Sequence, residues 1–114
     1  MKIDRSKLSH SWPVPTDALY PACDRASFDE CDSPVALNDV DMFDQLILLN
    51  WCIKLRKRKT FNRMQTSYGL KHRFERDTGI YVSNGAFKGA MLLVGFTAKD
   101  IADLNWYFNV KHVQ

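Results

Sequence analysis

The residues with the clearest chemical potential are a run of cations near the middle of the chain. Lys or Arg occupies five of the six positions 54–59, and Arg63 follows shortly after. Ammonium and guanidinium groups at this density are typical of phosphate contacts, because they neutralise phosphate charge and donate hydrogen bonds to its oxygens. Phe61 and Tyr68 lie close by in the sequence and could stack on a base, and Asn62 could hydrogen-bond to one.

Net charge changes sign along the chain. Residues 1–47 hold four Lys or Arg against nine Asp or Glu, whereas residues 48–114 hold twelve against four. The two parts therefore carry −5 and +8, which sum to the net charge of +3. A basic segment joined to an acidic one indicates a polyanionic partner for the basic part, with nucleic acid as the first candidate.

Eleven residues make up the candidate nucleic-acid surface. Six cations would meet backbone phosphates, three more would extend the patch, and two residues would lie nearest the groove of a duplex together with Ala98 and Ala102. In chain order the eleven are Lys54, Arg56, Lys57, Arg58, Lys59, Arg63, Lys71, Arg73, Lys88, Thr97 and Lys99.

Residues 87–106 fit the apolar pattern of a helix-turn-helix, a motif that places its second helix in the major groove of DNA. Asp100 and Asp103 count against this role, because phosphates repel exposed carboxylates. The alternative is that Gly95 only ends one helix and the next helix packs on it. With Gly95 as the turn glycine, the inward positions are Ala90, Val94, Phe96, Ile101 and Leu104.

Four helices are predicted from apolar periodicity and capping residues. They cover about residues 39–57, 67–78, 84–94 and 97–104. Each begins beside a residue whose side chain can accept a hydrogen bond from a backbone N–H, and the second and third end at a glycine.

Two short strands complete the predicted architecture. Residues 80–82 read Ile-Tyr-Val, and residues 106–113 begin with the apolar–polar alternation that indicates a strand. The expected fold class is α+β and mainly α, with about four helices and a small two-stranded sheet. The order of these elements resembles that of a winged-helix domain. The expected domains are an irregular acidic N-terminal arm over residues 1–33 and a single compact helical domain over residues 34–114.

The histidines and cysteines do not form a pattern known for catalysis or metal binding. The three histidines are far apart, and the three cysteines are separated by eight and twenty-one positions, unlike the ligands of a zinc finger. The glycines also lack the spacing of a phosphate-cradling loop. We therefore expect no enzyme activity, no cofactor and no metal.

The sequence also predicts a location. The first residues lack the apolar core of a signal peptide, and no apolar run approaches the length that spans a bilayer. An odd number of cysteines fits reduced thiols better than a disulfide framework. These features predict a cytoplasmic protein without a membrane partner.

Two stretches carry a resemblance to a known family. Residues 66–72 read TSYGLKH and residues 81–92 read YVSNGAFKGAML. Over roughly residues 60–108 the chain resembles a family of small uncharacterised proteins carried by bacterial phages, plasmids and integrative elements. The family has no assigned activity, so the resemblance implies a mobile-element setting and no catalytic residues.

The glycines and tyrosines of these stretches allow two interpretations. Gly69, Gly85 and Gly89 would let helices approach closely, with Tyr68 and Tyr81 bracketing the contact, and we favour this interpretation. The alternative is a small concave site that holds a phosphate at a helix N-terminus. Its lining would be Tyr68, His72, Tyr81, Ser83, Asn84 and Lys88.

The first functional hypothesis is a small nucleic-acid-binding accessory or regulatory protein of a phage or plasmid. The alternative is a protein inhibitor of a host defence nuclease complex, of the anti-CRISPR type, that binds this nucleoprotein partner through the acidic arm or an exposed aromatic residue. A third hypothesis is a purely structural homodimer that binds no nucleic acid. The partner-binding residues of the inhibitor would be Trp12, Asp24, Asp29, Glu30 and Asp32.

Overall fold

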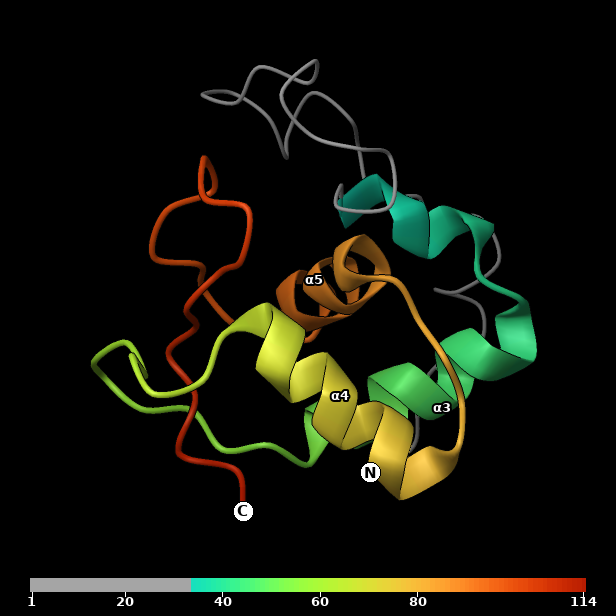
Figure 1. Ribbon diagram of the computed structural model, residues 1–114, viewed down its shortest axis with the longest axis horizontal. Coiled ribbons are helices and arrows are strands. Elements are labelled where there is room, and N and C mark those ends of the chain that lie inside the picture. The colour runs from blue at the N-terminus through green and yellow to red at the C-terminus, as the bar shows by residue number, and fades with distance from the viewer. Residues whose placement is uncertain (1–33) are drawn as a thin grey trace.

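The computed structural model describes residues 34–114, which contain one 3-10 helix and three α-helices (Figure 1). The 3-10 helix η3 covers Pro34–Asp39, and the α-helices are α3 (Met42–Ile53), α4 (Ser67–Thr78) and α5 (Asn84–Leu93). The predicted acidic arm, with its five candidate partner-binding residues, lies outside the described residues.

Local capping signals explain where α4 and α5 begin and end. The Thr66 hydroxyl accepts a hydrogen bond from a backbone N–H in the first turn of α4, and Gly79 ends this helix in the left-handed conformation, with a φ of 75°. Ser83 caps α5 in the same way as Thr66 caps α4. Gly95 follows the last turn of α5 with a φ of 101°. The predictions for these two helices are confirmed.

Helix α3 is shorter than predicted at both ends. Asp41, rather than an earlier residue, caps it by accepting a hydrogen bond of 3.1 Å from the backbone N–H of Phe43. Residues 34–39 before it form η3 instead. Beyond Ile53 the backbone leaves the helix, because Arg56 and Arg58 hydrogen-bond to a distant part of the chain.

Helix α5 is the central element of the core. Every residue from Asn84 to Met91 is buried, and α3, α4 and η3 all pack against this helix. The buried side chains of α4 that face it include Leu70 and Phe74. Among residues 34–114, no helix combines the length and the apolar character that crossing a membrane requires.

Gly89 lets η3 pack directly on α5. A Cβ at this position would overlap the carbonyl oxygen of Pro34 and lie 2.9 Å from the Cβ of Leu37.

We expect Gly89→Ala to lower the free energy of unfolding by about 1–3 kcal/mol, the usual cost of overpacking, in a urea titration. The control is Gly69→Ala in α4, where the nearest atom would be 3.9 Å from the new Cβ. Alanine there should stabilise the helix by up to ~1 kcal/mol, and a similar effect of both substitutions would contradict the close contact.

Residues 106–111 form an extended segment, the C-terminal segment, that lies between two loops. On one side its carbonyl groups accept hydrogen bonds of 2.9 Å from the backbone N–H groups of Arg58 and Asn62. On the other side the N–H of Lys99 donates to it, also at 2.9 Å. Trp106, Phe108 and Val110 are buried, so the alternation seen in the sequence is present as alternating burial.

The predicted two-stranded sheet is nevertheless wrong. Two hydrogen bonds join residues 58–62 to the C-terminal segment, from Arg58 to Asn109 and from Asn62 to Phe108. Their acceptors are adjacent residues, but their donors are four residues apart, so residues 59–61 have no place in a ladder. A ladder needs donors and acceptors in matched register. Residues 34–114 therefore contain isolated antiparallel bridges and no strand, and residues 80–82 form none either.

The predicted fourth helix, over residues 97–104, is also wrong. The carbonyl oxygen of Thr97, which would accept the first hydrogen bond within this helix, instead accepts one of 3.3 Å from the backbone N–H of Asn109 in the C-terminal segment. Ala98 forms an antiparallel bridge with Phe108 of the same segment. Leu104, expected to point inward, is 50% exposed. Without this helix there is no helix-turn-helix, and the resemblance to a winged helix fails with it.

Candidate functional site

The six predicted phosphate-contacting cations lie on the loop between α3 and α4, residues 54–65, which we name the basic loop. All six are exposed to solvent, and within the described part of the chain none has a carboxylate within ion-pair distance. Lys57 Nζ lies 5.7 Å from the centroid of the Phe96 ring, and the Arg58 guanidinium donates to the Thr60 hydroxyl. Among residues 34–114, no cation–π contact or side-chain hydrogen bond involves the other four loop cations, Lys54, Arg56, Lys59 and Arg63.

Buried polar groups hold the end of the basic loop. Asn62 is 2% exposed, donates a hydrogen bond of 3.1 Å to Gln65 and accepts one of 2.9 Å from the backbone N–H of Met64. The Gln65 amide in turn hydrogen-bonds to both backbone groups of Val113. Asn62 therefore maintains the shape of the loop and does not present its amide to a base, in contrast to the sequence interpretation.

One further cation, Lys111, lies beside the basic loop, and Lys99 lies across the C-terminal segment from it. The backbone N–H of Lys111 donates to the carbonyl oxygen of Arg56 at 2.8 Å, and the Lys111 side chain is exposed. Thr97 and Lys99, also exposed, flank the other side of the C-terminal segment. The sequence interpretation missed Lys111, because nothing local to it shows that its backbone pairs with Arg56.

Three cations predicted to extend the patch lie largely inside the molecule. Lys71 is 4% exposed and Lys88 is 1% exposed, with Lys88 Nζ 4.7 Å from the centroid of the Trp106 ring. Arg73 is half-buried, and its Nε and Nη2 atoms are shielded from solvent without a hydrogen bond in the described residues. Lys71 and Lys88 thus add nothing to the exposed charge.

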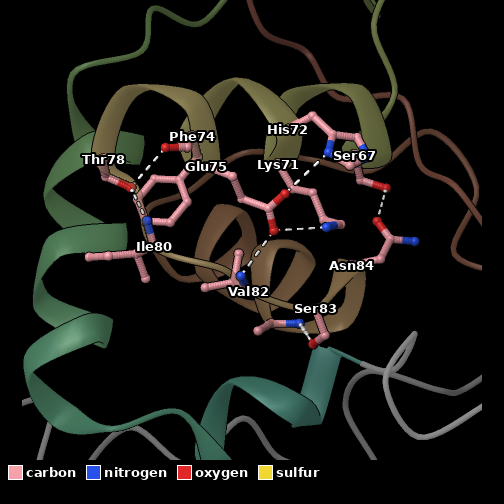
Figure 2. A network of polar contacts seen from close by, with 11 residues as sticks. Ser67, Lys71, His72, Phe74, Glu75, Thr78, Ile80, Val82, Ser83 and Asn84 are labelled. Atoms are coloured by element: carbon pink, nitrogen blue, oxygen red, sulfur yellow. Dashed lines mark hydrogen bonds and ion pairs between the residues drawn. The ribbon is translucent and has the colours of Figure 1, made fainter.

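Glu75 joins α4 to the segment that leads into α5 (Figure 2). Its Oε2 atom accepts hydrogen bonds from Lys71 Nζ at 2.9 Å and from the backbone N–H of Val82 at 3.1 Å. Its Oε1 atom lies 3.1 Å from His72 Nδ1. The side chains of Lys71 and Glu75 are 5% and 18% exposed, so a buried ammonium group is balanced by a mostly buried carboxylate.

A second polar network joins the starts of α4 and α5. The Ser67 hydroxyl donates to Asn84 Oδ1 at 2.9 Å, a contact drawn in Figure 2, and accepts from the backbone N–H of Trp106 at 3.0 Å. The Asn84 amide nitrogen donates to Asn105 Oδ1 at 2.9 Å and to the Leu104 carbonyl oxygen at 3.3 Å. This network fixes residues 104–106 against the two helices.

A shallow pocket of about 390 Å³, which we name the tyrosine pocket, is lined by residues of both networks. Tyr68 and Tyr81 are 48% and 76% exposed, and Lys71 Nζ lies 5.5 and 4.8 Å from their ring centroids. The lining residues are Tyr68, Lys71, His72, Tyr81, Ser83, Asn84, Leu104 and Asn105.

The tyrosine pocket contains five of the six residues predicted for a concave site. Lys88 is the exception, because its ammonium group lies over Trp106 in the core. The favoured interpretation, close helix packing bracketed by the tyrosines, concerns three glycines. Close packing is present at Gly89, where the packed element is η3, and absent at Gly69. The tyrosines themselves are exposed rather than buried in a helix contact.

Glu75 makes the stability of the fold depend on pH. Burial opposes ionisation of its carboxyl group, but hydrogen bonds from Lys71 and the Val82 N–H, together with the charges of Lys71 and His72, outweigh burial and lower its pKa. Because the folded pKa lies below the unfolded one, this stabilisation is complete above the ordinary value of 4.5 and is lost as pH falls through the lowered pKa.

Urea unfolding between pH 7 and about pH 3 measures this dependence. Wild-type protein should lose stability below about pH 4.5 more steeply than Glu75→Gln, since the other carboxylates contribute equally to both proteins. Identical acid dependence of the two proteins would contradict the role of Glu75.

The described residues show no sign of metal or thiol chemistry. Residues 34–114 contain no group of three or more His, Cys, Asp or Glu side chains that could hold a metal ion. Cys52 is fully buried in α3, and burial raises the pKa of its thiol, which therefore stays protonated. Cys23 and Cys31 lie outside the described residues.

Comparison with known proteins gives no match to a protein-family model, a curated protein or a solved structure. The likeness of residues 66–72 and 81–92 to a mobile-element family is an expectation from the sequence.

Proposed function

We propose that this protein binds nucleic acid through the basic loop, as an accessory or regulatory protein of a mobile genetic element. The observation that carries the proposal is the set of six exposed loop cations without an ion-pair partner among residues 34–114. Cations of this kind replace the counterions of phosphates, and release of those counterions favours binding. The mobile-element setting is the part that the family resemblance implies.

The backbone of the basic loop supports this role, because it is held in place before any ligand binds. Hydrogen bonds from the N–H groups of Arg58 and Asn62 fix it to the C-terminal segment, and Arg56 accepts one from Lys111. A loop that is already ordered loses less entropy on binding. The exposed side chains of Lys99 and Lys111 add cations next to the same segment.

The proposed contacts are to the sugar–phosphate backbone. Residues 97–104, expected to enter a duplex groove, are not helical, so the proposal does not include recognition of base edges by a helix. Phosphate contacts position a protein on nucleic acid and carry no sequence information directly. Binding should accordingly tolerate changes of sequence and respond strongly to salt.

Fluorescence anisotropy tests the proposal. The full chain is titrated into labelled single-stranded DNA, duplex DNA and RNA of equal length, at about 50 and 200 mM salt. Six phosphate contacts predict that the increase in salt weakens binding roughly 300-fold for a single strand and roughly 2,000-fold for a duplex. A folded protein that binds none of the three at low salt, or binds equally well at both, would contradict the proposal.

A further inference from the structure

We propose that the tyrosine pocket binds one unstacked base of a single-stranded nucleic acid whose phosphates lie along the basic loop, an inference that rests on the proposed function. Single-strand binders combine a cationic surface with aromatic side chains on which bases stack. The basic loop supplies the first of these features. The tyrosine pocket supplies the second, because Tyr68 and Tyr81 are exposed aromatic residues of its lining.

The two tyrosine rings lie close enough together to border one site. Both lie within 6 Å of one atom, Lys71 Nζ, so their centroids are at most about 10 Å apart. A base that enters the site can therefore stack on either ring.

The charge of the pocket favours a neutral base over a phosphate group. The ammonium of Lys71 is already balanced by Glu75 at 2.9 Å, and the Ser83 hydroxyl already caps the N-terminus of α5. A bound phosphate needs a cation to balance its charge, and the positive charge of Lys71 is already balanced by Glu75. This observation argues against the phosphate site that the sequence interpretation left open.

Polar groups in the pocket remain available for the edge of a base. Within the described residues, no hydrogen bond uses the phenol groups of Tyr68 and Tyr81 or the amide nitrogen of Asn105. Lys71 Nζ carries three N–H groups and, among residues 34–114, donates one hydrogen bond, to Glu75. The pocket therefore has hydrogen-bond donors and acceptors for the edge of a base, in addition to its two aromatic rings.

The pocket lies within reach of the basic loop. Arg63 and Tyr68 are five residues apart, so the chain between them spans at most about 18 Å. A single strand held by the loop can place one base in the pocket. A duplex cannot do so without unpairing and unstacking that base, which costs free energy. The inference therefore predicts a preference for single strands.

Replacing the rings while keeping the charge tests the inference. The full-length double variant Tyr68→Ala/Tyr81→Ala is compared with Tyr68→Phe/Tyr81→Phe, using a labelled oligothymidine of about 15 nucleotides and a duplex of the same length. Loss of stacking should weaken single-strand binding by about 5- to 150-fold in the alanine variant and much less in the phenylalanine variant. Duplex binding and the salt dependence should stay unchanged, because neither ring neutralises a phosphate.

The outcomes separate the two proposals. Wild-type affinity of the alanine variant for the single strand would overturn the pocket and leave the basic loop in place as the binding surface. No binding by the wild-type protein to either probe would overturn both proposals. Equal losses on single strand and duplex would also overturn the pocket, and circular dichroism checks that both variants fold.

Photochemical crosslinking gives an independent readout. A single strand carrying 5-iodouracil forms a crosslink, on irradiation, to an aromatic residue stacked on that base. Peptide mapping should find the crosslink on Tyr68 or Tyr81 in wild-type protein. Crosslinks confined to Phe61 or to the C-terminal segment would contradict a base in the tyrosine pocket.

Discussion

Reversing three charges of the basic loop, in Arg56→Glu/Lys59→Glu/Arg63→Glu, should weaken nucleic-acid binding on the order of 1,000-fold or more. Each reversal removes one attraction and adds one repulsion to a phosphate, at about 1 kcal/mol each near an anionic surface. The three side chains are exposed and have no ion-pair partner among residues 34–114, so the fold should be unaffected. Anisotropy titrations at several salt concentrations measure the effect.

The corresponding alanine variant tests the mechanism. Removing three phosphate contacts should reduce the slope of log K against log salt by about 2 on a single strand. The matched control is Arg76→Glu compared with Arg63→Glu, since each changes the net charge by the same amount. Arg76 is exposed and lies ten residues beyond Thr66, about 15 Å along α4. That distance exceeds the Debye length of ~10 Å at 0.1 M salt, so Arg76→Glu should have the smaller effect, and equal effects would locate binding elsewhere.

Glu75→Ala should lower the free energy of unfolding by about 3–5 kcal/mol, the usual cost of removing one partner of a buried ion pair. The substitution leaves the Lys71 ammonium buried without its counter-ion and the Val82 N–H without its acceptor. A domain of this size has a total stability of only about 5–15 kcal/mol, so the loss is a large part of it. Urea unfolding followed by circular dichroism measures the change.

The double variant Lys71→Met/Glu75→Gln distinguishes charge pairing from simple packing. It removes both charges and keeps a carbonyl oxygen that can accept from Val82, so it should cost less than about 2 kcal/mol. If the double variant were as unstable as Glu75→Ala, burial of an unpaired charge would not explain the loss. Tyr81 adjoins the segment that Glu75 holds, so loss of the carboxylate should also weaken single-strand binding.

The sequence predicts those helices whose ends depend on neighbouring residues. Thr66 and Gly79 bound α4, and Ser83 and Gly95 bound α5, because a cap is made by side chains within a few positions. The predicted helix over residues 97–104 failed for the opposite reason. The Thr97 carbonyl oxygen, which would accept its first hydrogen bond, accepts from the C-terminal segment instead, and no local pattern encodes that partner.

The candidate site follows the same division. The exposed cations of the basic loop could be predicted, because a dense run of like charges has to lie in solvent. The burial of Lys71 and Lys88 could not, since it depends on Glu75, on two tyrosines and on the ring of Trp106. Cation–π and ion-pair partners that enclose a lysine come together only in the folded chain.

The hydrogen bonds between the basic loop and the C-terminal segment also set an order of events during translation. A ribosome delivers the chain from its N-terminus, at about 5–20 residues per second. The loop cations are synthesised early, but the carbonyl groups that hold their backbone belong to residues 106–111. The nascent chain therefore contains the loop cations before their backbone can be held in place, and the proposed nucleic-acid surface is completed only after α3, α4 and α5 have been made.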